Sequence, residues 1–277
     1  MKKLVLTGAA GKLGSQLRAP LAALAERLVS TDLSDLQGDL AGNETFVQAD
    51  LADKDAMRTL IDGADMVVHF GAIGDEAPFE DILGPNIIGA YNVWEAARLT
   101  GVRRVVYASS IHAVGMHPKT QAIGVDVPHR PDGFYGLAKC FSEDLARMYW
   151  EKAGVEAVCL RILSCTPEPM NTRALGSWLS YPDLIRLVKR AIDTPTTGFS
   201  VIYGVSDNDR APVDNGAARH LGYRPEDNAE AQAEALLAAA GPADPQDPAQ
   251  MCHGGPFAAA ELNAAGIAAE HLVTRKQ

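Results

Sequence analysis

Thr7-Gly8-Ala9-Ala10-Gly11-Lys12-Leu13-Gly14 is the stretch that decides the fold. The apolar run at 3–7 predicts a strand, and leucines at helical spacing after Gly14 predict a helix. Glycine lets backbone approach a pyrophosphate, and a helix N-terminus offers free N–H groups and a positive dipole end. The spacing is GxxGxxG rather than GxGxxG, and an ordinary tight turn is the alternative. We interpret the stretch as a dinucleotide phosphate site.

Strand and helix patterns continue to alternate after this turn. Apolar runs predict strands at 27–31, 45–49, 65–70, 103–109, 156–162 and 199–204, and helical spacing predicts helices at 79–99, after Tyr135, at 181–192 and at 229–240. Such alternation is typical of a doubly wound parallel sheet that binds ligands at the carboxyl ends of its strands. Gly8, Asp32, Asp50, Gly71 and Ser110 all fall at those ends. We therefore predict an α/β, Rossmann-like fold.

Two acidic residues follow predicted strands. Asp32 lies about 20 positions beyond the glycine turn, where a carboxylate holds the ribose hydroxyls of NAD and repels the 2′-phosphate of NADP. Its alternative role is a helix or turn cap. Asp50 could reach an adenine amino group or cap the helix that follows it. Both interpretations remain open for Asp32 and for Asp50.

Tyr135 and Lys139 stand four residues apart, on one face of a predicted helix. A free tyrosine has a pKa near ~10, and a neighbouring cation favours the phenolate. Lys139 could therefore tune Tyr135 into a proton acceptor. The spacing alone is common, so the interpretation depends on the nucleotide site upstream.

Composition limits the partners and the compartment. The chain has 277 residues and a net charge of −10, which argues against nucleic acid and anionic membranes as partners. Its four cysteines form no CxxC pair, and no His/Cys cluster has metal-ligand spacing. The apolar run at the start is too short for a signal peptide. We expect a soluble cytoplasmic protein with free thiols and without a metal.

Several motifs in order carry a resemblance to a known family. The glycine turn, Ser110 and Tyr135-x-x-x-Lys139 resemble the extended short-chain dehydrogenase/reductases. The stretches 86–92, 130–141, 164–169, 201–204 and 227–230 are similar to uronate dehydrogenases within them. The similarity spans nearly the whole chain and is weakest after Gly241. It implies NAD-dependent oxidation of the C1 hydroxyl of galacturonate or glucuronate to an aldarolactone.

The resemblance also implies residue roles. Tyr135 would accept the C1 hydroxyl proton, Lys139 would lower its pKa and hold the nicotinamide ribose, and Ser110 would bind the reacting oxygen. Arg173 falls on the family arginine that binds the substrate carboxylate. The expected cofactor contacts are Gly8, Gly11, Lys12, Leu13, Gly14, Asp32, Asp50, Leu51, Gly71, Ala72, Asn86, Tyr135, Lys139 and Cys165. The expected substrate contacts are Ile111, His112, Ser164 and Arg173. For His112 a structural role is the alternative.

Three departures from the family pattern touch the substrate side. Ile111 replaces an asparagine, Gly74 replaces a serine, and Ala211-Pro212-Val213 precedes Asp214-Asn215 where the family has a tryptophan pair. A site that lacks partners for a sugar hydroxyl rejects that sugar. Oxidation of another aldose or acidic sugar is therefore one alternative. A non-catalytic NAD-binding regulator is an alternative of another class. The resemblance alone implies a homo-oligomer.

The chain shows no internal repeat and no clear linker. We predict an NAD-binding domain at 1–162 and a smaller substrate-binding region at 163–277, packed on it. The segment after Gly241 is expected to be either a packed arm or partly mobile.

Overall fold

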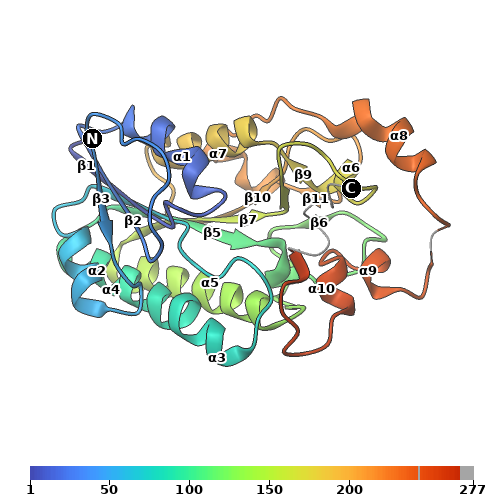
Figure 1. The fold of residues 1–277 in the computed structure, drawn as a ribbon, viewed down its shortest axis with the longest axis horizontal. Coiled ribbons are helices and arrows are strands. Elements are labelled where there is room, and N and C mark those ends of the chain that lie inside the picture. Colours follow the sequence, from blue (N-terminus) through green and yellow to red (C-terminus); the bar gives the residue numbers. More distant parts are fainter. Residues whose placement is uncertain (243, 269–277) are drawn as a thin grey trace.

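Seven parallel strands form one central sheet in the order β10-β7-β5-β4-β1-β2-β3 (Figure 1). The structure is a computed structural model that describes residues 1–242 and 244–268. The strands are β1 (Lys3–Thr7), β2 (Arg27–Asp32), β3 (Glu44–Gln48), β4 (Met66–His69), β5 (Arg104–Ser110), β7 (Glu156–Ile162) and β10 (Phe199–Gly204). Strand order reverses between β1 and β4, which places a ligand crevice at their carboxyl ends. The predicted Rossmann-like fold is confirmed.

Helices cover both faces of the sheet. One face packs against α1 (Gly14–Ala22) and α7 (Tyr181–Asp193), and the other against α2 (Lys54–Ile61), α4 (Gly89–Thr100) and α5 (Phe134–Ala153) (Figure 1). Side chains of β1 alternate between these layers: Leu4 and Leu6 join the first core, and Val5 joins the second. The sheet is therefore buried on both faces, which explains the continuous apolar runs in its sequence.

Shorter elements complete the chain. They are α3 (Phe79–Ile82), a π-helical segment (Leu83–Ile88), β6 (Ile123–Gly124), β8 (Ser164–Cys165), α6 (Ala174–Ser177), β9 (Trp178–Leu179), β11 (Val213–Asp214), α8 (Ala233–Ala238), α9 (Pro248–Met251) and α10 (Pro256–Ala259), with 3₁₀ turns at Ile111–Val114, Gly216–Leu221 and Ala229–Gln232. Among the described residues, no helix is both long enough and apolar enough to cross a membrane.

Two predicted helices differ from the structure. The continuous helix expected at 79–99 is interrupted by the π-helical segment, which contains Pro85. Proline lacks an N–H, so the regular helical bond ladder cannot pass through it unchanged. The helix expected at 229–240 is shorter, because a 3₁₀ turn precedes α8.

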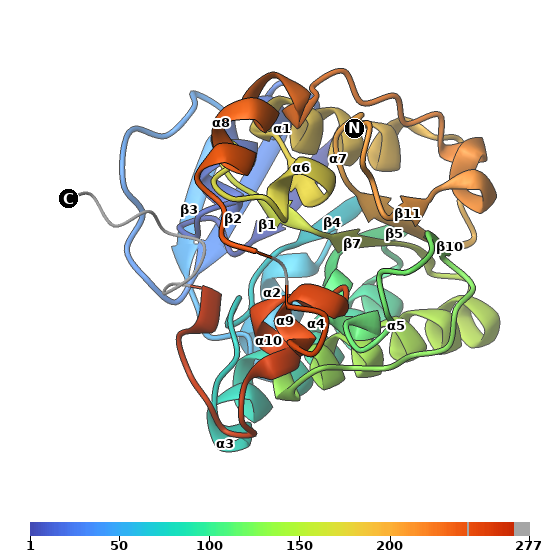
Figure 2. The same cartoon turned by 90° about the vertical axis from the view of Figure 1, so that its right-hand side faces the viewer.

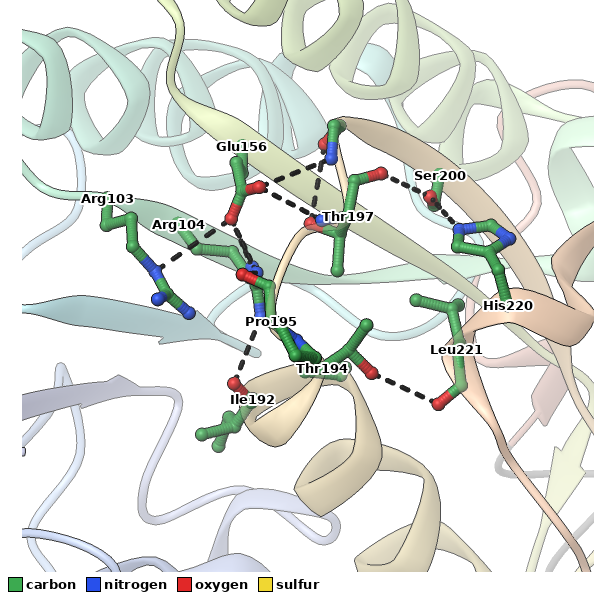
Figure 3. Close-up of polar contacts among 12 residues, drawn as sticks. Arg103, Arg104, Glu156, Ile192, Thr194, Pro195, Thr197, Ser200, His220 and Leu221 are labelled. Carbon is green, nitrogen blue, oxygen red and sulfur yellow. Dashed lines mark hydrogen bonds and ion pairs between the residues drawn. The ribbon is translucent and has the colours of Figure 1, made fainter.

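A buried ion pair ties the amino ends of β5 and β7 to α7 (Figure 3). The Arg104 side chain is fully buried, and its Nε donates to Glu156 at 2.9 Å. Its Nη1 donates to two carbonyl oxygens in the last turn of α7, those of Ala191 and Ile192, at 2.8 and 3.0 Å. Because α7 ends on this fixed guanidinium, the pair orders the end of the sheet opposite the candidate site.

The C-terminal segment packs back onto the sheet's carboxyl end (Figures 1 and 2). The N–H groups of His253 and Gly254 bond the carbonyls of His117 and Gly115 at 2.9 and 2.8 Å. These contacts agree with the packed-arm alternative around His253 and Gly254; residues 243 and 269–277 lie outside the described part. The division at 162 remains a prediction, and both α7 and β10, which follow it, belong to the main layers.

Candidate active site

The glycine turn brings β1, the start of α1 and the exit of β4 into close approach. Gly8 has φ +75, and a Cβ there would lie 2.5 Å from the backbone N of Gly71. A Cβ on Gly14 would lie 1.9 Å from the carbonyl oxygen of Gly8, and one on Gly11 would lie 3.2 Å from it. Only glycine fits at the first and last of these positions. α1 begins at Gly14, so its free N–H groups face this turn.

Asp32 is held against this turn. Its Oδ2 accepts from the backbone N of Ala10 at 2.9 Å, and its Oδ1 accepts from Ser34 N at 3.1 Å. No helix begins between Asp32 and β3, so the helix-cap alternative is wrong and the turn alternative describes the local bonds of Asp32. The tight turn and the adjoining carboxylate fit a dinucleotide, whose pyrophosphate needs close backbone and whose ribose needs an acceptor.

Asp50 does not cap the next helix. Asp53 does, since its side chain accepts from Asp55 N and Ala56 N, both at 3.0 Å. Asp50 instead accepts from Ala52 N at 2.8 Å in a local turn and is exposed. The capping alternative for Asp50 is therefore wrong, and an adenine contact remains a prediction.

The other predicted cofactor residues surround the same crevice. Leu51 packs closely against Gly71: a Cβ added to Gly71 would lie 2.9 Å from Cδ1 of Leu51. Both amide atoms of Asn86 bond the backbone of Ile73, at 2.8 and 3.0 Å, which fixes the loop leaving β4. Burial raises the pKa of the Cys165 thiol to about 12, and the charge of Lys12 opposes this. Contacts of Lys12, Leu13, Leu51, Ala72, Asn86 and Cys165 with the cofactor remain predictions.

Ser110, Tyr135 and Lys139 meet where β5 ends and α5 begins. Lys139 Nζ donates to the carbonyl of Ala108 at 2.7 Å and lies 5.2 Å from the Tyr135 ring centroid. Burial raises the pKa of Tyr135 to about 12, and a hydrogen bond with Ser110 lowers it. Burial also lowers the pKa of Lys139 to about 7. Burial therefore has the largest effect on the pKa of Tyr135, and the lowering of that pKa by Lys139 remains a prediction.

Close packing sets the position of Tyr135. A Cβ on Gly136 would lie 2.3 Å from the carbonyl oxygen of His112, so glycine lets α5 approach the turn after β5. The helix has no side-chain cap at Gly133. Glu76, from the loop after β4, accepts from the backbone N of Phe134 at 2.7 Å and of Tyr135 at 2.9 Å. Sequence reasoning missed Glu76; an uncapped helix start carrying the tyrosine was the one available indication.

His112 lies beside Tyr135, with 5.6 Å between ring centroids. Its Nδ1 pairs with Asp132 at 2.7 Å, and its ring stacks on Phe257 at 3.8 Å. Both the structural and the substrate-facing interpretations agree with this position. Asp132 and Phe257 were not predicted, because they reach His112 from distant parts of the chain.

Arg173 and Ser164 are bonded to each other: Arg173 Nη1 donates to Ser164 Oγ at 2.6 Å. Burial lowers the pKa of Arg173 to about 10. Ile111, by contrast, is 1% exposed and packs in an apolar cluster with Val114 and Ile123. The structure thus gives Ile111 a packing role, and a contact of Ile111 with the substrate remains a prediction. Gly74 is exposed, and a Cβ added there would meet no atom within 4 Å.

The fold and this arrangement of side chains are typical of dinucleotide-dependent oxidoreductases. Residues 4–168 match the model of the NAD dependent epimerase/dehydratase family, and the chain belongs to that family. It is 45% identical to uronate dehydrogenase from Pseudomonas putida over 93% of this chain and 96% of that protein. It is 48% identical to uronate dehydrogenase from Agrobacterium fabrum over 93% and 97%. A solved structure of an Agrobacterium tumefaciens uronate dehydrogenase variant complexed with NAD matches with TM-score 0.90 and 46% identity, covering 94% of this chain and 98% of that one.

Proposed function

We propose that the chain is an NAD-dependent dehydrogenase that oxidises C1 of a pyranose uronic acid to an aldarolactone. Its similarity to uronate dehydrogenases over nearly the whole chain supports this reaction. The observation that carries the proposal is the joint presence of an acid–base group, at Ser110 and Tyr135, and of a cation, Arg173, bonded to Ser164. A uronic acid presents a C1 hydroxyl to the first and a carboxylate to the second.

Bound NAD supplies the two-electron acceptor for this oxidation. Tyr135 takes the proton of the C1 hydroxyl, and Ser110 holds the reacting oxygen through a hydrogen bond. Lys139 holds a positive charge near the phenolate as it forms, which lowers the free energy of that state. Arg173 orients the far end of the sugar through its carboxylate. Glu76 fixes the backbone that carries Tyr135.

The test is NADH formation, followed by absorbance, with galacturonate, glucuronate, galactose, glucose and arabinose. We expect turnover with one or both uronates and little with the neutral sugars. Tyr135→Phe should lower kcat by about two to four orders of magnitude while circular dichroism stays unchanged. Uronates that are inert beside an active neutral sugar would establish the second candidate, another aldose dehydrogenase, which the missing hydroxyl at Gly74 favours.

We also propose that the chain works as a cytoplasmic homo-oligomer. Leu137, Phe141 and Met148 are exposed on one face of α5, and Tyr91 is exposed on α4. Apolar side chains on long surface helices fit a second copy of the chain. Light scattering should give at least twice the 29.4 kDa chain mass, and Phe141→Asp should reduce it. A monomer for the unsubstituted chain would contradict this assembly.

A further inference from the structure

Asp132 carries a fully buried carboxylate next to His112. Its side chain is 0% exposed, and its Oδ2 lies 2.7 Å from Nδ1 of His112. Its Oδ1 is buried and has no hydrogen-bond partner. Within residues 1–242 and 244–268, the carboxylate forms no hydrogen bond other than the one with His112. Burying a charge with one polar partner costs free energy, so this pair needs a reason beyond stability.

Three glycines make room for the carboxylate of Asp132. A Cβ added to Gly115 or to Gly254 would lie 1.9 or 1.8 Å from its Oδ2, and a Cβ added to Gly136 would lie 3.0 Å from its Oδ1. These glycines come from the turn after β5, from the C-terminal segment and from α5. Because three separate segments lack a side chain here, the fold holds a space for this carboxylate against His112.

The imidazole ring of His112 is held from other directions as well. Phe257 stacks on it with 3.8 Å between ring centroids, and the Tyr135 ring meets it in a T-shaped arrangement at 5.6 Å. The backbone N of His112 donates to Ser110 Oγ at 3.3 Å. These contacts keep the ring beside both members of the acid–base group.

The bond with Asp132 determines which ring nitrogen of His112 carries the hydrogen. An ionised carboxylate only accepts hydrogen bonds, so Nδ1 donates. In a neutral imidazole the other nitrogen, Nε2, is then a hydrogen-bond acceptor. In the part of the chain that the structure describes, Nε2 has no hydrogen-bond partner, and it is not sealed from solvent. Nε2 is therefore an accessible acceptor on a ring that stands beside Tyr135.

We propose that Asp132 is a positioning residue, which fixes His112 with Nε2 as the acceptor for the C2 hydroxyl of the sugar. This inference rests on the proposed oxidation at C1. The two ring neighbours of C1 are C2, which bears a hydroxyl, and the ring oxygen, which has no hydrogen to donate. With the C1 hydroxyl at Tyr135, an acceptor in the adjoining position selects the C2 hydroxyl.

The tautomer of His112 is tested by magnetic resonance on the full chain with ¹⁵N-labelled histidine, in alkaline buffer and without NAD or sugar. The His112 signal is the one that is lost in His112→Gln. We expect the Nδ1–H form alone in the unsubstituted chain. Asp132→Asn keeps the shape, but its amide can donate to Nδ1, so the Nε2–H form should appear.

Kinetics test the contact with the sugar. For the sugar that the chain oxidises, Asp132→Asn should raise KM by about threefold to tenfold, the value of one net hydrogen bond, with little change in kcat. For the 2-deoxy analogue, as substrate or competitive inhibitor, Asp132→Asn should bind as the unsubstituted chain does. Asp144→Asn is the matched control, because it neutralises an exposed carboxylate 3.6 Å from His129 Nδ1, and KM should not change.

Circular dichroism checks the fold of each variant. An Nε2–H signal in the unsubstituted chain, or the Nδ1–H form alone in Asp132→Asn, overturns the tautomer that Asp132 is proposed to fix. An equal rise in KM for the sugar and for its 2-deoxy analogue makes Asp132 merely structural and overturns the C2 contact. A chain that oxidises no sugar contradicts the proposed oxidation and the C2 contact with it, while the tautomer is still decided by the spectrum.

Discussion

The carboxylate of Glu76 accepts a hydrogen bond from the backbone N–H of Tyr135 at 2.9 Å. A second bond, from Phe134 N at 2.7 Å, makes Glu76 the cap of α5 in place of a local side chain. The loop after β4 therefore sets where the helix begins and where Tyr135 stands. Burial raises the pKa of Glu76, which is the cost of placing this acceptor in the interior.

Glu76→Gln should lower kcat with little change in the affinity for NAD. A glutamine offers one carbonyl oxygen where two carboxylate oxygens now accept, so one N–H of the first turn loses its partner. Displacement of a reacting group by about 1 Å can cost about 100-fold in rate. Steady-state kinetics and an NAD titration measure the two effects. Glu80→Gln, on the exposed side of α3, is the matched control; an unchanged kcat in Glu76→Gln would show that Tyr135 is positioned without this cap.

Gly14→Ala should weaken both folding and NAD binding. The added Cβ would lie 1.9 Å from the carbonyl of Gly8, so the turn must open or α1 must shift. We expect a loss of roughly 1–3 kcal/mol in the free energy of unfolding, measured in urea, and weaker NAD binding, measured by fluorescence titration.

Gly84→Ala is the comparison for this change. It meets no atom within 4 Å, although it also lies in a helical segment near the site. A stable, NAD-binding Gly14→Ala would mean that the turn does not need glycine at its last position.

The free energy of unfolding should fall in acid, because Glu143 becomes protonated there. Burial opposes its ionisation, but hydrogen bonds from His129 and Arg161 outweigh burial and lower the pKa to about 2. A lowered folded pKa stabilises the folded state above the ordinary value of 4.5, and this contribution disappears between pH 4.5 and about 2. Urea unfolding at several pH values should show this loss in the unsubstituted chain.

Glu143→Gln should remove much of that dependence and leave Arg161 uncompensated, at a cost of about 3–5 kcal/mol at pH 7. Glu151→Gln breaks an exposed pair with Arg147 and should change stability by less than about 1 kcal/mol. An acid dependence that is the same in Glu143→Gln and the unsubstituted chain would assign it to other carboxylates.

Local patterns in the sequence predicted the sheet and the glycine turn correctly, because apolar periodicity and glycine spacing act within a few residues. The sequence also placed Ser110 and Tyr135 at strand and helix ends that the fold brings together. Contacts across the chain were missed for the opposite reason. Glu76 and Phe257 reach their partners only after folding, and nothing near them in sequence identifies those partners.

Local sequence patterns also did not predict the directions of individual side chains. Ile111 stands next to Ser110, and sequence reasoning placed both toward the substrate. The 3₁₀ turn after β5 instead directs Ile111 into the apolar cluster with Val114 and Ile123. Asp53 rather than Asp50 caps α2, since the loop between β3 and α2 is longer than the sequence pattern suggested.

Restoring the family residue at Gly74 and at Ile111 should have opposite effects: Gly74→Ser should leave folding unaffected, whereas Ile111→Asn should destabilise the fold. Gly74→Ser adds a side chain where no atom lies within 4 Å of the new Cβ, so folding should be unaffected. If the hydroxyl reaches the sugar, KM for the preferred uronate should fall by roughly threefold to tenfold, the value of one net hydrogen bond. Ile111→Asn instead places an amide in an apolar cluster and should cost about 2–4 kcal/mol of unfolding free energy. Urea unfolding and KM measured on both variants separate the effects, and a stable Ile111→Asn with lower KM would return that position to the substrate site.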